Sequence, residues 1–159
     1  MHYYDRLAAG YNELHEEEQL KKLQVLLKHV TFRGKILDVG AGTCLVARHL
    51  DKNIQCISVD SSKEMLAKGV GERHVAKAES LPFSNGIFDG VISLTALHHA
   101  DFQQALAEIK RVARPGATIA ISFLKKSPKL TRFATALHAF FSSIKQYDAH
   151  QDILFVMRT

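Results

Sequence analysis

Cysteine and proline are scarce in this sequence of 159 residues, which has two cysteines and three prolines. Cys44 and Cys56 each lie in an apolar or glycine-rich stretch. Two such cysteines cannot form the disulfide framework of a small secreted protein, and they supply too few ligands for a structural zinc site. Because a chain of this length buries enough apolar surface to fold without either, we expect a reducing compartment and no metal.

Long apolar segments are also missing. The sequence has no run of about 18 apolar residues, and its N-terminus lacks the basic region and apolar stretch of a secretion signal. No segment has the composition of a linker, and no internal repeat is visible. These absences predict a cytoplasmic protein without membrane contact, folded as a single domain over residues 1–159. The net charge of +5 favours anionic partners only weakly.

An amphipathic helix is predicted at residues 13–30, where apolar residues recur at helical spacing. On its polar side Glu18 stands four residues before Lys22, a spacing that favours an ion pair. The apolar positions are Leu20, Leu23, Leu27 and Val30.

Five short apolar segments then indicate strands, at 35–39, 54–59, 73–78, 88–94 and 117–123. Helical segments separate them: Ser61 and Glu64 have the spacing of a capping box, and Asp101 can cap a helix with an apolar face. This alternation predicts a parallel sheet covered on both faces. The expected fold class is therefore α/β, a Rossmann-like doubly wound sheet of five parallel strands alternating with helices.

The tail is predicted as a helix at 130–141 and a short closing β-hairpin, with strands at 144–147 and 153–157. The single domain thus comprises an N-terminal lid and helix (1–30), a cofactor-binding core (34–124) and a shortened C-terminal helix and hairpin (125–159). No insertion remains for a separate acceptor-recognition domain.

The first predicted strand ends in a glycine-rich turn, Gly40-Ala41-Gly42. In open parallel sheets the ligand binds beyond the carboxyl ends of the strands, and this turn approaches it most closely. Glycines let the backbone lie against the ligand, and the N-terminus of the next helix favours an anionic group. A dinucleotide fingerprint beginning at Gly40 requires glycine at position 45, which is Leu45. The spacing therefore disfavours a nicotinamide cofactor.

A second acidic residue, Asp60, ends the second predicted strand at the same edge of the sheet. Its two carboxylate oxygens can accept hydrogen bonds from both hydroxyls of a ribose. Asp38, Gly40 and Gly42 resemble motif I of the class I S-adenosylmethionine (SAM)-dependent methyltransferases, in which an acidic residue precedes G-x-G-x-G by two positions. Cys44 replaces the third glycine of that motif.

The resemblance covers most of the chain and is strongest to the methyltransferase type 11 group. It implies SAM as cofactor, S-adenosylhomocysteine as product, and methyl transfer to an acceptor that the sequence does not identify: a small molecule, RNA or protein. The segments that carry the resemblance, besides motif I, are 78–83, 88–93, 97–99, 108–116 and 152–158.

The resemblance also implies roles for individual residues. Tyr4 and Tyr11 belong to an N-terminal segment that covers the cofactor in relatives, and Met65 packs near the adenine. Lys77 stands where family members often have an aspartate that contacts the adenine amino group, so Glu79 or a backbone carbonyl would replace it. The full set of predicted cofactor-binding residues is Tyr4, Tyr11, Asp38, Gly40, Ala41, Gly42, Asp60, Ser61, Met65, Ala78, Glu79 and Thr95.

Several roles stay open at this point. Asp38 either touches the ligand or holds the loop through backbone hydrogen bonds. His98 and His99 follow the fourth strand, where they act as a general base or shape the pocket. The basic residues Lys125, Lys126, Lys129 and Arg132 attract nucleic acid or form a solvated loop.

Two rival functions remain, a non-enzymatic SAM-binding or scaffold subunit and, less favoured, a nicotinamide oxidoreductase. Some relatives pair with a small zinc-binding activator protein, so the resemblance leaves open an activator or a second copy of the chain as partner.

Overall fold

The computed structural model describes residues 3–159, and in the first helix it describes side chains from residue 13 onward. The predicted lid residues Tyr4 and Tyr11 lie outside the described side chains. In chain order the elements are α1 Tyr3–His29, β1 Lys35–Val39, α2 Leu45–His49, β2 Gln55–Asp60, α3 Lys63–Ala67, β3 Glu72–Val75, β4 Phe88–Leu94, α4 Phe102–Val112, β5 Ala113–Leu124, α5 Leu130–Phe140, β6 Lys145–Ala149 and β7 Asp152–Arg158.

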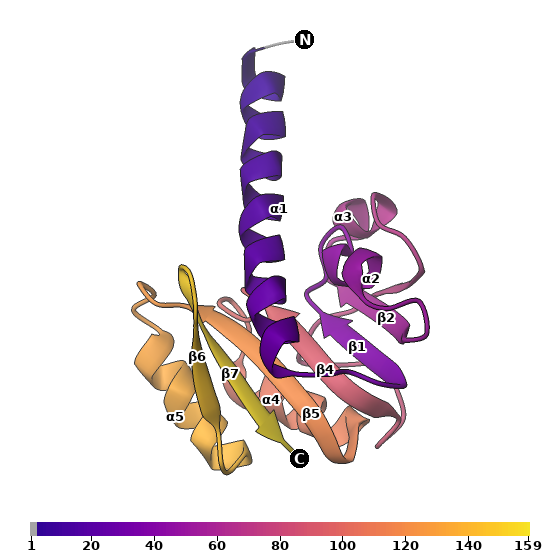
Figure 1. Ribbon diagram of the computed structural model, residues 1–159, viewed down its shortest axis with the longest axis vertical. Helices are drawn as coiled ribbons and strands as arrows, with labels where there is room; N and C mark the ends of the chain where they lie inside the picture. Colours follow the sequence, from indigo (N-terminus) through magenta and orange to yellow (C-terminus); the bar gives the residue numbers. More distant parts are fainter. Residues whose placement is uncertain (1–2) are drawn as a thin grey trace.

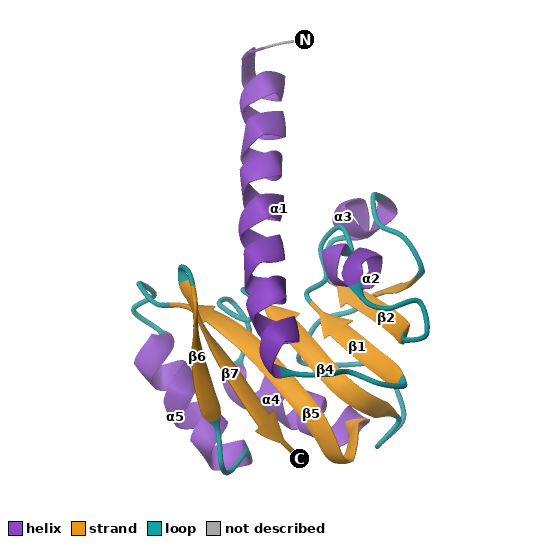
Figure 2. Cartoon of the chain, in the orientation of Figure 1, coloured by secondary structure: helices purple, strands orange, loops and turns teal. Residues whose placement is uncertain are grey.

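The strands form one seven-stranded sheet in the order β3-β2-β1-β4-β5-β7-β6 (Figures 1 and 2). Strands β1 to β5 run parallel, and β7 pairs antiparallel with both β5 and β6. The predicted doubly wound α/β sheet with a C-terminal hairpin is therefore confirmed. No described helix is both long enough and apolar enough to cross a membrane.

Helices connect the parallel strands except between β3 and β4. Residues 76–87, between β3 and β4, form a loop in the described chain. The segment contains Pro82 and the Asn85-Gly86 pair, which oppose a helix, and Gly86 has a φ of +62°. This loop carries part of the site described below.

Two apolar layers hold the helices against the sheet. On one face, α4 and α5 pack over Leu37, Ile119 and Phe155. On the other, α1 and α2 pack over residues that alternate with these, such as Ile36 and Ala120. Figure 1 shows α4 and α5 behind the sheet and α1 in front of it, extending beyond the sheet edge. Side chains at that edge therefore come from both the strands and α1.

The helix caps follow the sequence closely. Oδ1 of Asp101 accepts a hydrogen bond from Gln104 N at 3.0 Å, which confirms the predicted cap of α4. Helix α3 begins one residue later than the capping-box pattern indicates: Ser62, not Ser61, is its cap, and its Oγ accepts from Met65 N at 3.2 Å.

Helix α1 differs from its prediction in which residues it buries. Leu26 is fully buried, whereas Leu27 is 38% exposed. The expected Glu18–Lys22 ion pair does not form: Lys22 is buried against Asp152 of β7, and Glu18 accepts a hydrogen bond from Gln151. An exposed helical ion pair stabilises by only about 0.3–0.5 kcal/mol, whereas a buried carboxylate strongly requires a counter-charge.

Candidate functional site

A cleft of about 520 Å³ opens at the carboxyl ends of β1, β2 and β4. Every predicted cofactor-binding residue whose side chain is described lines this cleft. They come from four separate segments: Asp38, Gly40, Ala41 and Gly42; Asp60, Ser61 and Met65; Ala78 and Glu79; and Thr95. Long-range folding thus brings together residues that were selected from local patterns.

The glycine turn is held close to its neighbours. The N–H groups of Gly40 and Ala41 both donate to Val59 O at 2.9 Å. Gly40 has a φ of +74°, and a Cβ at this position would lie 2.2 Å from the Cβ of Ala96. Gly40 is therefore required sterically, because neither its backbone conformation nor its surroundings accept a side chain.

Cys44 retains the conformation of the glycine that it replaces. Its φ is +65°, in the left-handed region that favours glycine, and its side chain is fully buried against Gly69. The helix that follows, α2, has only five residues and no side-chain cap. The predicted attraction of an anion by this helix is therefore small, since the macrodipole of such a short helix is weak.

Asp60 holds the turn as well as facing the cleft. Its Oδ2 accepts a hydrogen bond from Gly42 N, and its Oδ1 accepts one from Ser62 N, both at 2.8 Å. A carboxylate offers about four acceptor positions, so each oxygen retains capacity for a ligand hydroxyl. Asp60 therefore holds the turn through backbone hydrogen bonds, the kind of role that the sequence left open for Asp38.

Asp38 is the electrostatically unusual residue of the cleft. It is 2% exposed, and its Oδ2 has no hydrogen-bond partner among the residues described. Burial, and then the nearby Asp60 carboxylate, raise the pKa of Asp38 to about 8. An orphaned carboxyl oxygen beside a cleft is suited to a donor or cation on the ligand. Together with the free acceptor positions of Asp60, this fits a cofactor that carries both hydroxyl groups and an ammonium group, as SAM does.

The loop that carries Ala78 and Glu79 is fixed from α4. Oε2 of Glu108 accepts from Leu81 N at 2.7 Å, and the Arg111 guanidinium donates to the carbonyls of Phe83 and Leu81 at 2.7 and 3.0 Å. Glu108 and Arg111 also bind each other, and that hydrogen bond lowers the pKa of Glu108. Lys77 itself lines the cleft beside Ala78.

The two candidate histidines are separated by the structure. His99 is exposed and lines the cleft. His98 is absent from the cleft: its ring stacks on Phe123 at 4.0 Å between centroids, and its Nε2 accepts from Leu124 N at 3.3 Å. Burial lowers the pKa of His98, which favours the neutral ring that this acceptor role requires. Of the pair, only His99 is placed to meet a substrate.

Helix α1 supplies residues that the sequence reasoning missed. His15, Glu16 and Gln19 line the cleft. Their signal in the sequence was weak: His15, Gln19 and the buried Lys22 recur at intervals of four and three residues, the spacing of one helix face. Other lining residues that had not been selected are Val39, Thr43, Leu45, Val46, Ala76, Leu94, Ala96, Leu97 and Ala100.

Most of the predicted basic cluster is engaged within the chain. Lys125 contacts Asp148, and Lys129 Nζ donates to His98 O at 2.8 Å. The guanidinium of Arg132 lies 5.3 Å from the ring centroid of Phe102. The ion pair of Lys125 with Asp148 offsets one of the charges in this cluster.

Comparisons with known proteins agree with this geometry. A family model described as a methyltransferase domain matches residues 37–121. A demethylmenaquinone methyltransferase of Mycobacterium marinum is 37% identical over 120 residues, which are 71% of this chain and 48% of the relative. The chain thus spans about half the length of the curated relatives that it matches.

Solved structures share the fold at low sequence identity. A SAM-dependent methyltransferase from Aquifex aeolicus aligns with a TM-score of 0.72 at 17% identity, covering 94% of this chain and 97% of that one. A chain from the Haloferax volcanii complex of the Trm112 methyltransferase activator aligns with a TM-score of 0.76 at 17% identity, covering 99% and 98%.

Proposed function

Because this chain belongs to the methyltransferase-domain family of the class I SAM-dependent methyltransferases, we propose that it transfers a methyl group from SAM to an acceptor, leaving S-adenosylhomocysteine. The observation that carries the proposal is the convergence of Asp38, the glycine turn, Asp60 and the 78–79 loop on one cleft.

In this proposal the chain acts mainly by binding and orientation. SAM supplies a methyl group on a sulfonium, which is already a good leaving group. Asp60 would bind the ribose hydroxyls, the glycine turn would follow the cofactor backbone, and Asp38 would face its ammonium. Holding the reactants in line and excluding water then account for most of the acceleration.

A base is needed only when the acceptor atom carries a proton that is hard to remove. His99, exposed at the cleft, is the candidate for that role. An acceptor without such a proton would require no base, and His99 would then shape the pocket.

The acceptor class, whether small molecule, RNA or protein, is not identified by the cleft. The mycobacterial relatives are named for demethylmenaquinone, so a quinol of this type is the first small molecule to test. Lys125 and Lys129 bind other residues of the chain, so RNA is to be tested as an acceptor after the small molecules.

A partner forms the second part of the proposal. The Haloferax neighbour was solved with a methyltransferase activator, which supports testing a small activator protein, or a second copy of the chain, as the factor that completes the acceptor site. A SAM-binding subunit without turnover is the rival function.

Calorimetry with SAM, S-adenosylhomocysteine and NAD tests the cofactor first. Binding of the first two but not of NAD supports the proposal, and failure of the folded chain to bind SAM refutes it. Transfer of a radiolabelled methyl group to quinol, RNA, protein and metabolite fractions, with and without co-purifying protein, then distinguishes an enzyme from a silent subunit.

A further inference from the structure

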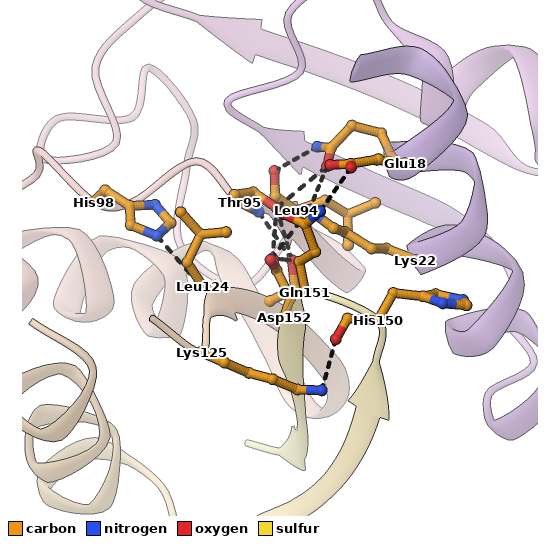
Figure 3. Close-up of polar contacts among 12 residues, drawn as sticks. Glu18, Lys22, Leu94, Thr95, His98, Leu124, Lys125, His150, Gln151 and Asp152 are labelled. Atoms are coloured by element: carbon orange, nitrogen blue, oxygen red, sulfur yellow. Dashed lines mark hydrogen bonds and ion pairs between the residues drawn. The ribbon is translucent and has the colours of Figure 1, made fainter. Parts of the chain in front are cut away.

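A buried polar network joins α1 to the C-terminal strand β7 beside the cleft (Figure 3). Lys22 is 2% exposed, and Asp152 is fully buried. Nζ of Lys22 lies 3.1 Å from Oδ1 of Asp152, and since Oδ1 has no hydrogen-bond partner in the described part of the chain, this contact is one of charge. The same ammonium donates to Thr95 Oγ1 at 2.9 Å and to Gln19 Oε1 at 3.0 Å.

The energy of a buried ion pair does not explain its presence. Removing two charges from water offsets most of their attraction, and apolar side chains of similar volume often give equal or greater stability. The role of this ion pair is therefore sought in the neighbouring groups that it holds, and not in its own energy. Those groups include Thr95 and Gln19, both of which line the cleft.

Thr95 is held in a conformation that its backbone disfavours. Its φ is +52°, in the left-handed region, where a β-branched residue is strained. Its N–H donates to Ser122 Oγ at 2.9 Å, and its hydroxyl donates to Asp152 Oδ2 at 2.5 Å. Ser122 Oγ donates to the same Oδ2 at 2.8 Å. Asp152 is thus the common acceptor that keeps Thr95 in place.

The residue after Thr95 packs against the glycine turn. Ala96 lies so close to Gly40 that a Cβ added to Gly40 would be 2.2 Å from the Cβ of Ala96. Relaxation of the strained Thr95 backbone would move Ala96, and the surface against which Gly40 rests would move with it. A mechanical connection therefore runs from Asp152 through Thr95 and Ala96 to the turn.

We propose that Lys22 and Asp152 are positioning residues for the cofactor turn, acting through Thr95 and Ala96 on Gly40. This inference rests on the proposed function, because it assumes that the turn binds SAM. It gives α1 and β7, which lie at opposite ends of the sequence, a shared role in cofactor affinity.

A double variant separates positioning from stability. Lys22→Met combined with Asp152→Leu removes both charges and leaves the hydroxyls of Thr95 and Ser122 without their acceptor. We expect a cooperatively folded protein, because removing the buried charges offsets part of the cost of the two unpaired hydroxyls, and a SAM dissociation constant raised at least about tenfold in calorimetry. A folded double variant that binds SAM within about twofold of wild type overturns the proposal.

A variant at Ser122, a buried residue outside the cleft lining, decides the matter even if the double variant does not fold. Ser122→Ala removes the hydroxyl that accepts from Thr95 N and donates to Asp152 Oδ2, and it should bind SAM about tenfold more weakly. An unchanged SAM dissociation constant in folded Ser122→Ala contradicts the proposal.

The matched control is Lys125→Met, which removes the exposed contact with Asp148 from the same hairpin. Lys125→Met should leave SAM affinity unchanged. A loss of SAM affinity in this control as large as that in the double variant would assign the effect to a general destabilisation of the hairpin and would contradict the proposal. A wild-type chain that binds no SAM refutes the proposed function itself, whereas normal wild-type binding with insensitive variants refutes only the positioning role.

Discussion

Replacement of Asp38 by asparagine should change how the stability of the protein depends on pH. The carboxyl is 2% exposed, its Oδ2 lacks a hydrogen-bond partner among the residues that the structure describes, and its pKa is raised from 3.8 to about 8 by burial and then by Asp60. Between these two pH values the folded protein holds a proton on Asp38 that the unfolded chain has lost. The stability that this residue contributes is therefore fully present below about pH 4 and is lost as the pH rises to about 8.

The size of the effect follows from the linkage between proton binding and folding. In this window the free energy of unfolding contributed by Asp38 falls by about 1.4 kcal/mol per pH unit. Asparagine has nearly the same shape and does not titrate. Between pH 5 and pH 7 the variant should therefore gain about 3 kcal/mol relative to the wild type, whatever constant difference the substitution adds.

Urea denaturation of both proteins at several pH values between 5 and 8 measures this difference. Asp51→Asn, at an exposed turn position, serves as the control and should give a pH profile parallel to that of the wild type. Parallel profiles for Asp38→Asn and the wild type would mean that Asp38 is ionised in the folded protein at these pH values, which would refute the raised pKa.

Three further variants test individual residues. Asp60→Ala should weaken SAM binding by about 2–4 kcal/mol in calorimetry, and unchanged affinity would refute the ribose assignment. The same variant should have a lower unfolding temperature, since Gly42 N and Ser62 N lose their acceptor. His99→Ala should lower turnover by less than about 100-fold with SAM affinity intact, and a loss of several thousand-fold would instead establish an essential base. His98→Ala should act mainly on stability, because it loses the stacking of His98 on Phe123. Cys44→Gly should change the free energy of unfolding by less than about 1 kcal/mol, because relief of backbone strain at a φ of +65° offsets the lost packing. Cys44→Val should lower the free energy of unfolding by about 2 kcal/mol or more. Equal unfolding temperatures for the two variants would contradict this expectation.

Local signals in the sequence were sufficient for most of the fold. Strands β1 and β4 begin and end at the residues predicted, and Asp101 caps α4 as expected. Each of these rests on a pattern contained within a few consecutive residues. The wrong predictions in α1 involved distant parts of the chain. Leu26 replaces Leu27 in the core, and Lys22 turns away from Glu18, because both respond to strands that only the folded sheet brings beneath α1.

The same distinction divides the site into a half that could be predicted and a half that could not. Binding of a ribose and a cofactor backbone needs a tight turn and a carboxylate at fixed distances along the chain, and such motifs remain visible as short patterns around Gly40 and Asp60. The α1 side of the cleft depends on His15, Glu16 and Gln19, which no ligand-binding motif marks, and Gln19 accepts a hydrogen bond from the buried Lys22. If catalysis consists mainly of alignment, no nucleophile or metal motif is required to mark the acceptor side. The residues that decide specificity there are then ordinary polar side chains, and their identity as site residues comes only from the contacts that hold them.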